Sequence, residues 1–81
     1  MFYVYILFSK THESYYVGST SMTLQERLRR HLSAHKGFTA RANDWEIVYQ
    51  ESFTNKSLAI LREQEIKKWK NKVKIEALIS K

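Results

Sequence analysis

The side chains best suited to chemistry are the tyrosines of two short apolar runs and the basic residues that follow them. Tyr5 ends a tyrosine-valine-tyrosine triplet, and Tyr16 begins a tyrosine-valine-glycine triplet. Arg27 and His31 follow, one helical turn apart. Phenol hydroxyls that meet beside a positioned guanidinium can form a site that attacks a phosphodiester. The same tyrosines can instead fill the aromatic side of a small core, so the elements that carry them must decide.

Both tyrosine runs have the composition of β-strands. Residues 2–8 and 15–20 are rich in β-branched and aromatic side chains, and the polar residues 10–14 between them suit a hairpin loop. We therefore expect two neighbouring antiparallel strands. Because glycine weakens a strand, Gly18 indicates a place where another backbone or a ligand comes close.

A helix is predicted directly after the second strand. Thr23 and Glu26 have the spacing of a capping box at its start. Three leucines recur every four residues as its expected buried stripe: Leu24, Leu28 and Leu32. Arg27 and His31 lie beside that stripe, where a charge without a partner or a ligand is costly. His31 and His35 both project toward the buried side, where each can instead be a histidine with a satisfied partner.

The rest of the chain predicts one more strand and two more helices. A loop over residues 37–44 leads to a strand over residues 45–53, and residues 54–55 can cap a second helix. Asn71 can cap a short third helix over residues 72–80. The order β-β-α-β-α-α gives an α+β, sandwich-like fold, in which a small three-stranded, mainly antiparallel sheet is flanked by helices.

The second helix carries a carboxylate at the edge of its apolar face. That face groups four residues around Arg62: Leu58, Ala59, Ile66 and Trp69. Glu63 lies on the rim of the face, and it can be approached because Ala59 is small. Glu63 also flanks Arg62 and Lys67, so an ion pair at the surface is the alternative interpretation.

Composition limits the class of protein. The 81 residues are enough for one domain, residues 1–81, near the lower size at which a single core suffices. The chain has no cysteine, so neither a disulfide nor a thiolate zinc site is available. No apolar stretch is long enough to cross a bilayer, and no secretory signal is visible. We therefore expect a cytoplasmic protein without a membrane partner.

Positive charge gathers in two places, and the formal net charge is +6. Such patches bind phosphate backbones without reading sequence, although each can also be a solvated helix face. A membrane surface fits less well, because neither basic helix has bulky apolar residues to spare from the core. We expect DNA, and by the same chemistry RNA, as the partner. The expected phosphate contacts are Arg29, Arg30, Arg41, Lys67, Lys68 and Lys70.

These motifs, in this order, resemble the GIY-YIG nuclease superfamily, and above all its small stand-alone single-domain bacterial members. Tyr5 matches the tyrosine that ends the first triplet of the family, and Tyr16 and Gly18 match the two ends of the second. Arg27 falls where the family has its helix arginine, and Glu63 where it has a metal-binding glutamate. The resemblance covers nearly the whole chain.

The resemblance implies a metal-dependent endonuclease that hydrolyses phosphodiester bonds of DNA. Glu63 would hold one Mg²⁺ or Mn²⁺, and Arg27 would stabilise charge on the phosphate. Tyr5 or Tyr16 would orient or deprotonate the attacking water, and the sequence does not choose between them. His31 would relay the proton or contact phosphate. Without a spare recognition helix, nicking or attack on single-stranded or branched DNA with little sequence specificity is expected, in DNA repair or recombination.

Two departures from the family pattern leave alternatives open. Many members carry a lysine just after the second triplet, where this chain has serine and threonine at residues 19–21, and Asn71 is only a candidate for an asparagine of the family. The runner-up function is therefore a nucleic-acid-binding protein with the nuclease fold and little or no catalysis. A protein–protein adaptor is the third alternative. A partner protein or a dimer would supply specificity in either nucleic-acid-binding case.

Overall fold

Three antiparallel strands form the sheet at the centre of the fold. They are β1 (Phe2–Ser9), β2 (Ser14–Thr20) and β3 (Glu46–Phe53). The order across the sheet is β2-β1-β3, so β1 is the central strand and β2 is an edge strand. The predicted hairpin is confirmed, and its register sets Tyr5 directly opposite Gly18.

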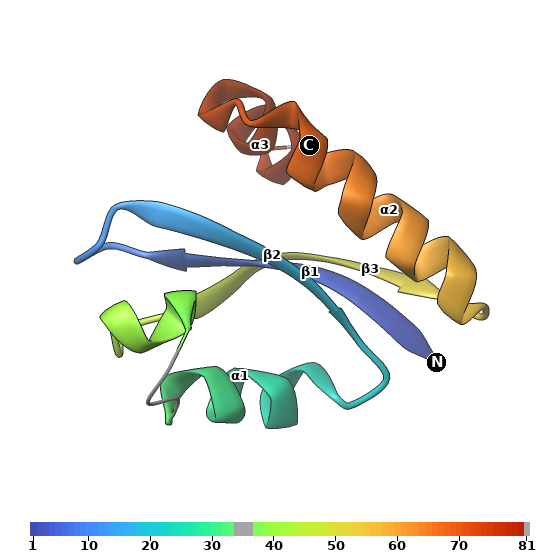
Figure 1. The fold of residues 1–81 in the computed structure, drawn as a ribbon, viewed down its shortest axis with the longest axis horizontal. Helices are drawn as coiled ribbons and strands as arrows, with labels where there is room; N and C mark the ends of the chain where they lie inside the picture. Colours follow the sequence, from blue (N-terminus) through green and yellow to red (C-terminus); the bar gives the residue numbers. More distant parts are fainter. Residues whose placement is uncertain (34–36, 81) are drawn as a thin grey trace.

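Helices cover both faces of this sheet (Figure 1). One face carries α1 (Leu24–Leu32) and a short 3₁₀ helix, η1 (Phe38–Arg41). The other face carries α2 (Lys56–Trp69) and α3 (Lys72–Ile79). The predicted order β-β-α-β-α-α and the α+β class are confirmed, and η1 is an addition inside the segment predicted as a loop.

The computed structural model describes residues 1–33 and 37–80, with the side chains of residues 38 and 41 left out of the description. His35 and the side chain of Arg41 therefore lie outside the described residues. Along the described residues, no helix is both long enough and apolar enough to cross a membrane.

The larger apolar cluster lies between the sheet and α2–α3. Its buried members come from both strands of the hairpin and from both helices: Val4, Ile6, Val17, Ala59, Ile66 and Leu78. Ala59 faces the sheet and is 1% exposed, which lets α2 lie close to β1. The prediction that Leu58 shares this face is wrong, because Leu58 is 52% exposed. One residue along a helix is a rotation of about 100°, so turning Ala59 inward turns Leu58 outward.

The second cluster lies on the α1 face and contains the first candidate site residue. Tyr5, Leu7 and Trp45 are buried there, and Leu24 and Leu28 pack against them. Leu32, the third predicted leucine of the stripe, is instead 39% exposed. His31, its neighbour, takes the buried position at the end of α1 and is 7% exposed. The last turn of α1 thus presents His31 to the sheet, as predicted, whereas Leu32 does not continue the buried stripe.

Asp44 fastens the hairpin turn to the segment that precedes β3. Its carboxylate accepts from Ser9 Oγ at 2.5 Å, and from the backbone N–H and the hydroxyl of Thr11 at 2.9 and 2.8 Å. Because these donors stabilise the carboxylate, the hydrogen bond from Ser9 foremost, the pKa of Asp44 falls to about 2. This link holds the β1–β2 turn in place at the end of the sheet remote from Gly18.

Candidate active site

Tyr5 is the centre of a hydrogen-bonded chain on the α1 face. Its hydroxyl accepts from Arg27 Nε at 3.1 Å and lies 2.8 Å from His31 Nε2. The other ring nitrogen, Nδ1 of His31, lies 3.1 Å from Thr39 Oγ1. Arg27 can only donate, so the phenol proton of Tyr5 is left for His31 Nε2, and we assign the imidazole proton to Nδ1. The chain therefore runs from Arg27 through Tyr5 and His31 to Thr39.

Local sequence explains why these side chains meet. The Thr23 hydroxyl accepts from the Glu26 N–H at 3.3 Å and starts α1, as predicted. Arg27 and His31 then lie four residues apart on one face of the helix, above Tyr5. The carboxylate of Glu26, which a capping box would turn back to Thr23, instead pairs with Arg29 at 2.6 Å.

Gly18 makes room for the Tyr5 ring. A Cβ atom at Gly18 would lie 2.5 Å from Tyr5 Oη and 2.7 Å from Tyr5 Cζ, closer than side chains can approach. It would also lie 3.1 Å from Tyr16 Cε2. The close approach predicted at this glycine exists, but it is made by the catalytic-candidate phenol of the neighbouring strand and not by a backbone or a ligand.

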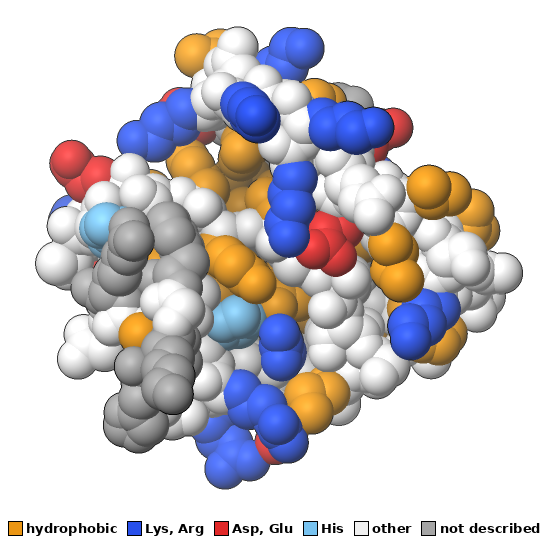
Figure 2. All heavy atoms as spheres, in the orientation of Figure 1, with side chains coloured by type: hydrophobic (Ala, Val, Ile, Leu, Met, Phe, Trp, Pro, Cys, Tyr) orange, Lys and Arg blue, Asp and Glu red, His pale blue; other side chains and the backbone are white. Residues whose placement is uncertain are grey.

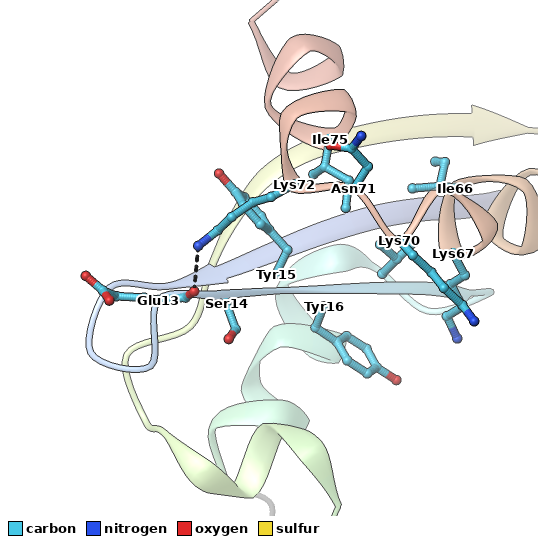
Figure 3. A pocket seen from close by; sticks show the side chains of 11 residues that line it. Glu13, Ser14, Tyr15, Tyr16, Ile66, Lys67, Lys70, Asn71, Lys72 and Ile75 are labelled. Carbon is cyan, nitrogen blue, oxygen red and sulfur yellow. Dashed lines mark hydrogen bonds between the residues drawn. The ribbon is translucent and has the colours of Figure 1, made fainter.

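Tyr16 completes an aromatic group with Tyr5 and His31. The Tyr16 and His31 rings meet edge to face at 4.9 Å between centroids, and the two tyrosine rings lie 6.5 Å apart. Tyr5 is 1% exposed, whereas Tyr16 is partly exposed. Tyr15 points to the opposite side of β2, as strand alternation predicts, and packs against the α2–α3 cluster (Figure 3).

Burial and the arginine set the protonation of the chain. Burial raises the pKa of Tyr5, and the hydrogen bond and charge of Arg27 offset part of that rise. Burial, and then the charge of Arg27, lower the pKa of His31. The bond to Tyr5 raises the pKa of Arg27. Near neutral pH the chain therefore holds a guanidinium, a protonated phenol and a neutral imidazole.

Glu63 reaches the same region from the other face of the sheet. Its Oε1 accepts from Ser19 Oγ at 2.5 Å, and its Oε2 pairs with Lys67 Nζ at 2.6 Å. The Glu63 side chain is only 18% exposed. Lys67 Nζ also lies 5.9 Å from the centre of the Tyr16 ring. Lys67 thus reaches around the free edge of β2 and links the carboxylate on one face to the tyrosine on the other.

Residues 1–76 match the model of the GIY-YIG catalytic domain. The chain belongs to the GIY-YIG family. Neither the curated proteins nor the solved structures compared with the chain include a significant match. Because GIY-YIG domains are nuclease domains, the expectation of a nuclease-type protein acting on nucleic acid is supported at that general level.

The GIY-YIG fold implies a divalent metal, and the donors here fit one. Among the residues that the structure describes, no three histidine, cysteine or acidic side chains gather into a metal cluster. Mg²⁺ does not need such a cluster, since it keeps several waters and is held by one or two carboxylates together with substrate phosphate. The Glu63 carboxylate already attracts a cation, the Lys67 ammonium at 2.6 Å. Glu63 therefore suits Mg²⁺ or Mn²⁺, provided that Lys67 moves aside.

The predicted phosphate-contacting residues of this GIY-YIG domain lie on both sides of the site. Lys67, Lys68 and Lys70 are exposed at the end of α2, and Arg29 and Arg30 are exposed on α1. In Figure 2, Lys and Arg side chains gather over α2–α3 and over α1, and the band between them holds hydrophobic side chains, a histidine, and a basic side chain beside an acidic one. A polyanion that crosses this band would meet positive charge on either side.

Two residues and one contact of the site were missed from the sequence. Thr39 holds His31 and is itself held through its carbonyl by Trp45 Nε1 at 2.9 Å, and no sequence signal identifies it. Ser19 is a polar residue on the α2 face of β2. Strand alternation places it on the same face as Tyr15 and Val17, and this signal could have identified it as a partner for a residue of α2. The ion pair of Lys67 with Glu63 is the alternative that the sequence offered for this carboxylate. The missed contact is the one between Lys67 and the Tyr16 ring, because it depends on the lysine side chain passing around a sheet edge.

Asn71 has a structural role in the described geometry. Its side-chain oxygen accepts from the Val73 N–H at 2.9 Å and caps α3, as the sequence predicts.

Proposed function

We propose that this protein is a divalent-metal-dependent endonuclease that hydrolyses phosphodiester bonds of DNA. One observation carries the proposal: the Arg27–Tyr5–His31 chain lies on one face of the sheet, and Lys67, which pairs with Glu63 on the other face, reaches around β2 to within 5.9 Å of the centre of the Tyr16 ring. Burial is the main cause of the raised pKa of Tyr5, and Arg27 offsets part of that rise. The charge of Tyr16 and then that of Glu63 raise the pKa further, which fits a carboxylate close to the chain. Basic residues flank this edge and suit a phosphate backbone.

Arg27 is the residue that we assign to the scissile phosphate. Its Nε is used on Tyr5, which fixes the guanidinium plane and leaves the terminal amino groups for phosphate oxygens. A charge held in place before the reaction costs no reorganisation when negative charge develops in the transition state. Tyr5 and His31 are, on this assignment, positioning residues for Arg27.

Tyr16 is the residue that we assign to the attacking water. It is the partly exposed member of the aromatic group, whereas Tyr5 is 1% exposed. The edge-to-face contact with His31 holds its ring in place. Its hydroxyl would orient the water toward the phosphorus.

Glu63 is the proposed metal ligand. A bound Mg²⁺ would supply Lewis-acid stabilisation of phosphate and leaving-group charge. Ser19 donates to one carboxylate oxygen and fixes the orientation of the group. Lys67 would leave the carboxylate and be free to contact the DNA backbone.

The test is cleavage of DNA by the purified protein. With Mg²⁺ we expect relaxation of supercoiled plasmid to nicked circles, or cleavage of single-stranded or branched oligonucleotides, and no product in EDTA. Arg27→Ala should lower the rate by about 10² to 10³, as removal of a transition-state donor does. Arg29→Ala is the comparison on the same helix, because the Arg29 side chain is 74% exposed. As a predicted phosphate contact, Arg29 should affect DNA affinity, whereas the single-turnover rate at saturating DNA should stay close to that of the wild type. No metal-dependent cleavage of duplex, single-stranded or branched DNA or of RNA would favour the non-catalytic binding protein instead.

A further inference from the structure

A groove separates β2 from the junction of α2 and α3. It encloses about 590 Å³, within the range of pockets that bind small organic ligands. Its floor is apolar and comes from the strand and from both helices: Tyr15, Val17, Ile66 and Ile75. Figure 3 shows the Tyr15 ring standing between β2 and α3 along this floor. The surface is one that a flat, weakly polar ring can lie against.

The rim of the groove is positively charged. Lys67, Lys70 and Lys72 line it, together with the single acidic residue Glu13. Lys72 Nζ donates to the backbone carbonyl of Glu13 at 3.0 Å and not to its carboxylate (Figure 3). Neither Lys70 nor Lys72 forms an ion pair with any carboxylate in the described part of the chain. The rim therefore keeps positive charge for a ligand that brings negative charge of its own.

The groove is continuous with the candidate active site. Tyr16 and Lys67 line the groove and also belong to the site, where Lys67 contacts both Glu63 and the Tyr16 ring. Tyr15 and Tyr16 are consecutive and point to opposite faces of β2 (Figure 3). A nucleic-acid strand that crosses the free edge of β2 at these residues would therefore pass directly from the groove to the site. A ligand in the groove would lie next to the bond that the site cuts.

We propose that this groove binds an unpaired nucleotide next to the scissile phosphate. The base lies on the apolar floor against Tyr15, and the flanking phosphates follow Lys67, Lys70 and Lys72. A base inside a duplex is stacked on both faces and paired along its edge, so it cannot reach the floor. The proposal rests on the proposed nuclease function and adds that single-stranded DNA, or the single-stranded arm of a branched substrate, is the preferred substrate.

Binding without metal tests the groove separately from catalysis. Fluorescence anisotropy in EDTA compares a single-stranded oligonucleotide with a duplex of the same length. We expect the wild-type protein to bind the single strand more tightly. Ile75→Asp should lower that affinity about tenfold and leave duplex affinity within twofold. Val73→Asp is its control, because this substitution adds the same charge to α3 at a position that is 72% exposed and outside the groove.

A rim variant and a cross-link keep the test decisive even where Ile75→Asp weakens the fold. Lys70→Ala should lower single-strand affinity several-fold more than Lys68→Ala, which removes the same charge from α2 outside the groove. Photocross-linking of an oligonucleotide that contains 5-iododeoxyuridine should map to Tyr15 or Tyr16. Equal affinity for single strand and duplex, equal effects of the two lysine variants, or a cross-link only at Trp69 would overturn the groove proposal. Absence of cleavage with this preference intact would overturn the nuclease proposal alone.

Discussion

Replacing Gly18 by alanine should dismantle the site from within. The new Cβ would lie 2.5 Å from Tyr5 Oη and 2.7 Å from Tyr5 Cζ, so the Tyr5 ring must move. That ring is held at its hydroxyl by Arg27 and His31. A ring displacement therefore breaks one or both of these hydrogen bonds and releases the guanidinium that we assign to the phosphate.

The expected loss of stability follows from three effects. Overpacking a tight core contact costs about 1–3 kcal/mol. Each lost hydrogen bond adds about 1 kcal/mol. Alanine returns about 0.5–1 kcal/mol relative to glycine in a strand, because its backbone has less freedom to lose. We expect a net destabilisation of about 2 kcal/mol, which for a domain of this size lowers Tm by roughly 8–16 °C.

The assay is a double-mutant cycle with Tyr5→Phe, measured by urea unfolding. Phenylalanine removes Oη, the atom nearest to the new Cβ, and removes both hydrogen bonds. Gly18→Ala should therefore destabilise the Tyr5→Phe protein by about 1 kcal/mol less than it destabilises the wild type. The rate of DNA cleavage by Gly18→Ala should also fall, because the displaced Tyr5 ring no longer holds Arg27 in place. Equal destabilisation in both backgrounds, or a neutral Gly18→Ala variant, would refute the close contact as the reason for this glycine.

Three further predictions concern charge. Lys67→Met should raise the affinity for Mn²⁺, measured by electron paramagnetic resonance, about two- to fivefold, because the metal no longer competes with an ammonium at Glu63; Lys68→Met should leave it unchanged. The lowered pKa of His31 means that its contribution to stability is complete above about pH 6.5 and is lost as the pH falls below that value. Urea midpoints between pH 7.5 and 5 should show this slope and lose it in His31→Gln, and an unchanged slope would contradict it. Because the pKa of Asp44 is lowered to about 2, the stability that its carboxylate contributes is lost as the pH falls from about 4 to about 2. Asp44→Asn should be destabilised at pH 7 and should lack that acid-dependent loss. A variant as stable as the wild type at pH 7 would show the link to be dispensable.

The fold was predictable because its signals are local. Strand composition, the caps Thr23, Asn55 and Asn71, and the helical periodicity each act within a few residues, and the structure forms each of these elements. The two wrong burial predictions, Leu32 and Leu58, have a common cause. Periodicity predicts the buried face of a helix only to within one residue. Which of two adjacent residues is buried against the sheet depends on the side chains of the sheet that face the helix.

The site was predictable only in part. The triplets and spacing predicted Tyr5, Tyr16, Arg27, His31 and Glu63 as site residues. The structure groups the first four on the α1 face of the sheet, and Glu63 lies on the other face, where Lys67 links it to Tyr16. The partners that hold them depend on side chains that cross between elements, such as Thr39 from η1 and Lys67 from α2. No pattern within a segment encodes such reach, so these contacts required the three-dimensional structure.

The most direct test of the account is the cleavage rate of Glu63→Gln across a series of Mg²⁺ concentrations, in single turnover. Glutamine keeps the size of the side chain and an acceptor for Ser19, but it removes the charge that would hold the metal. Glu65→Gln is the matched control, because Glu65 lies on the same helix with its side chain 58% exposed. We predict that Glu63→Gln cuts at least about 10²-fold more slowly than the wild type at every Mg²⁺ concentration, with its circular dichroism unchanged, and that Glu65→Gln stays within twofold. Cleavage by Glu63→Gln at the wild-type rate would contradict the account.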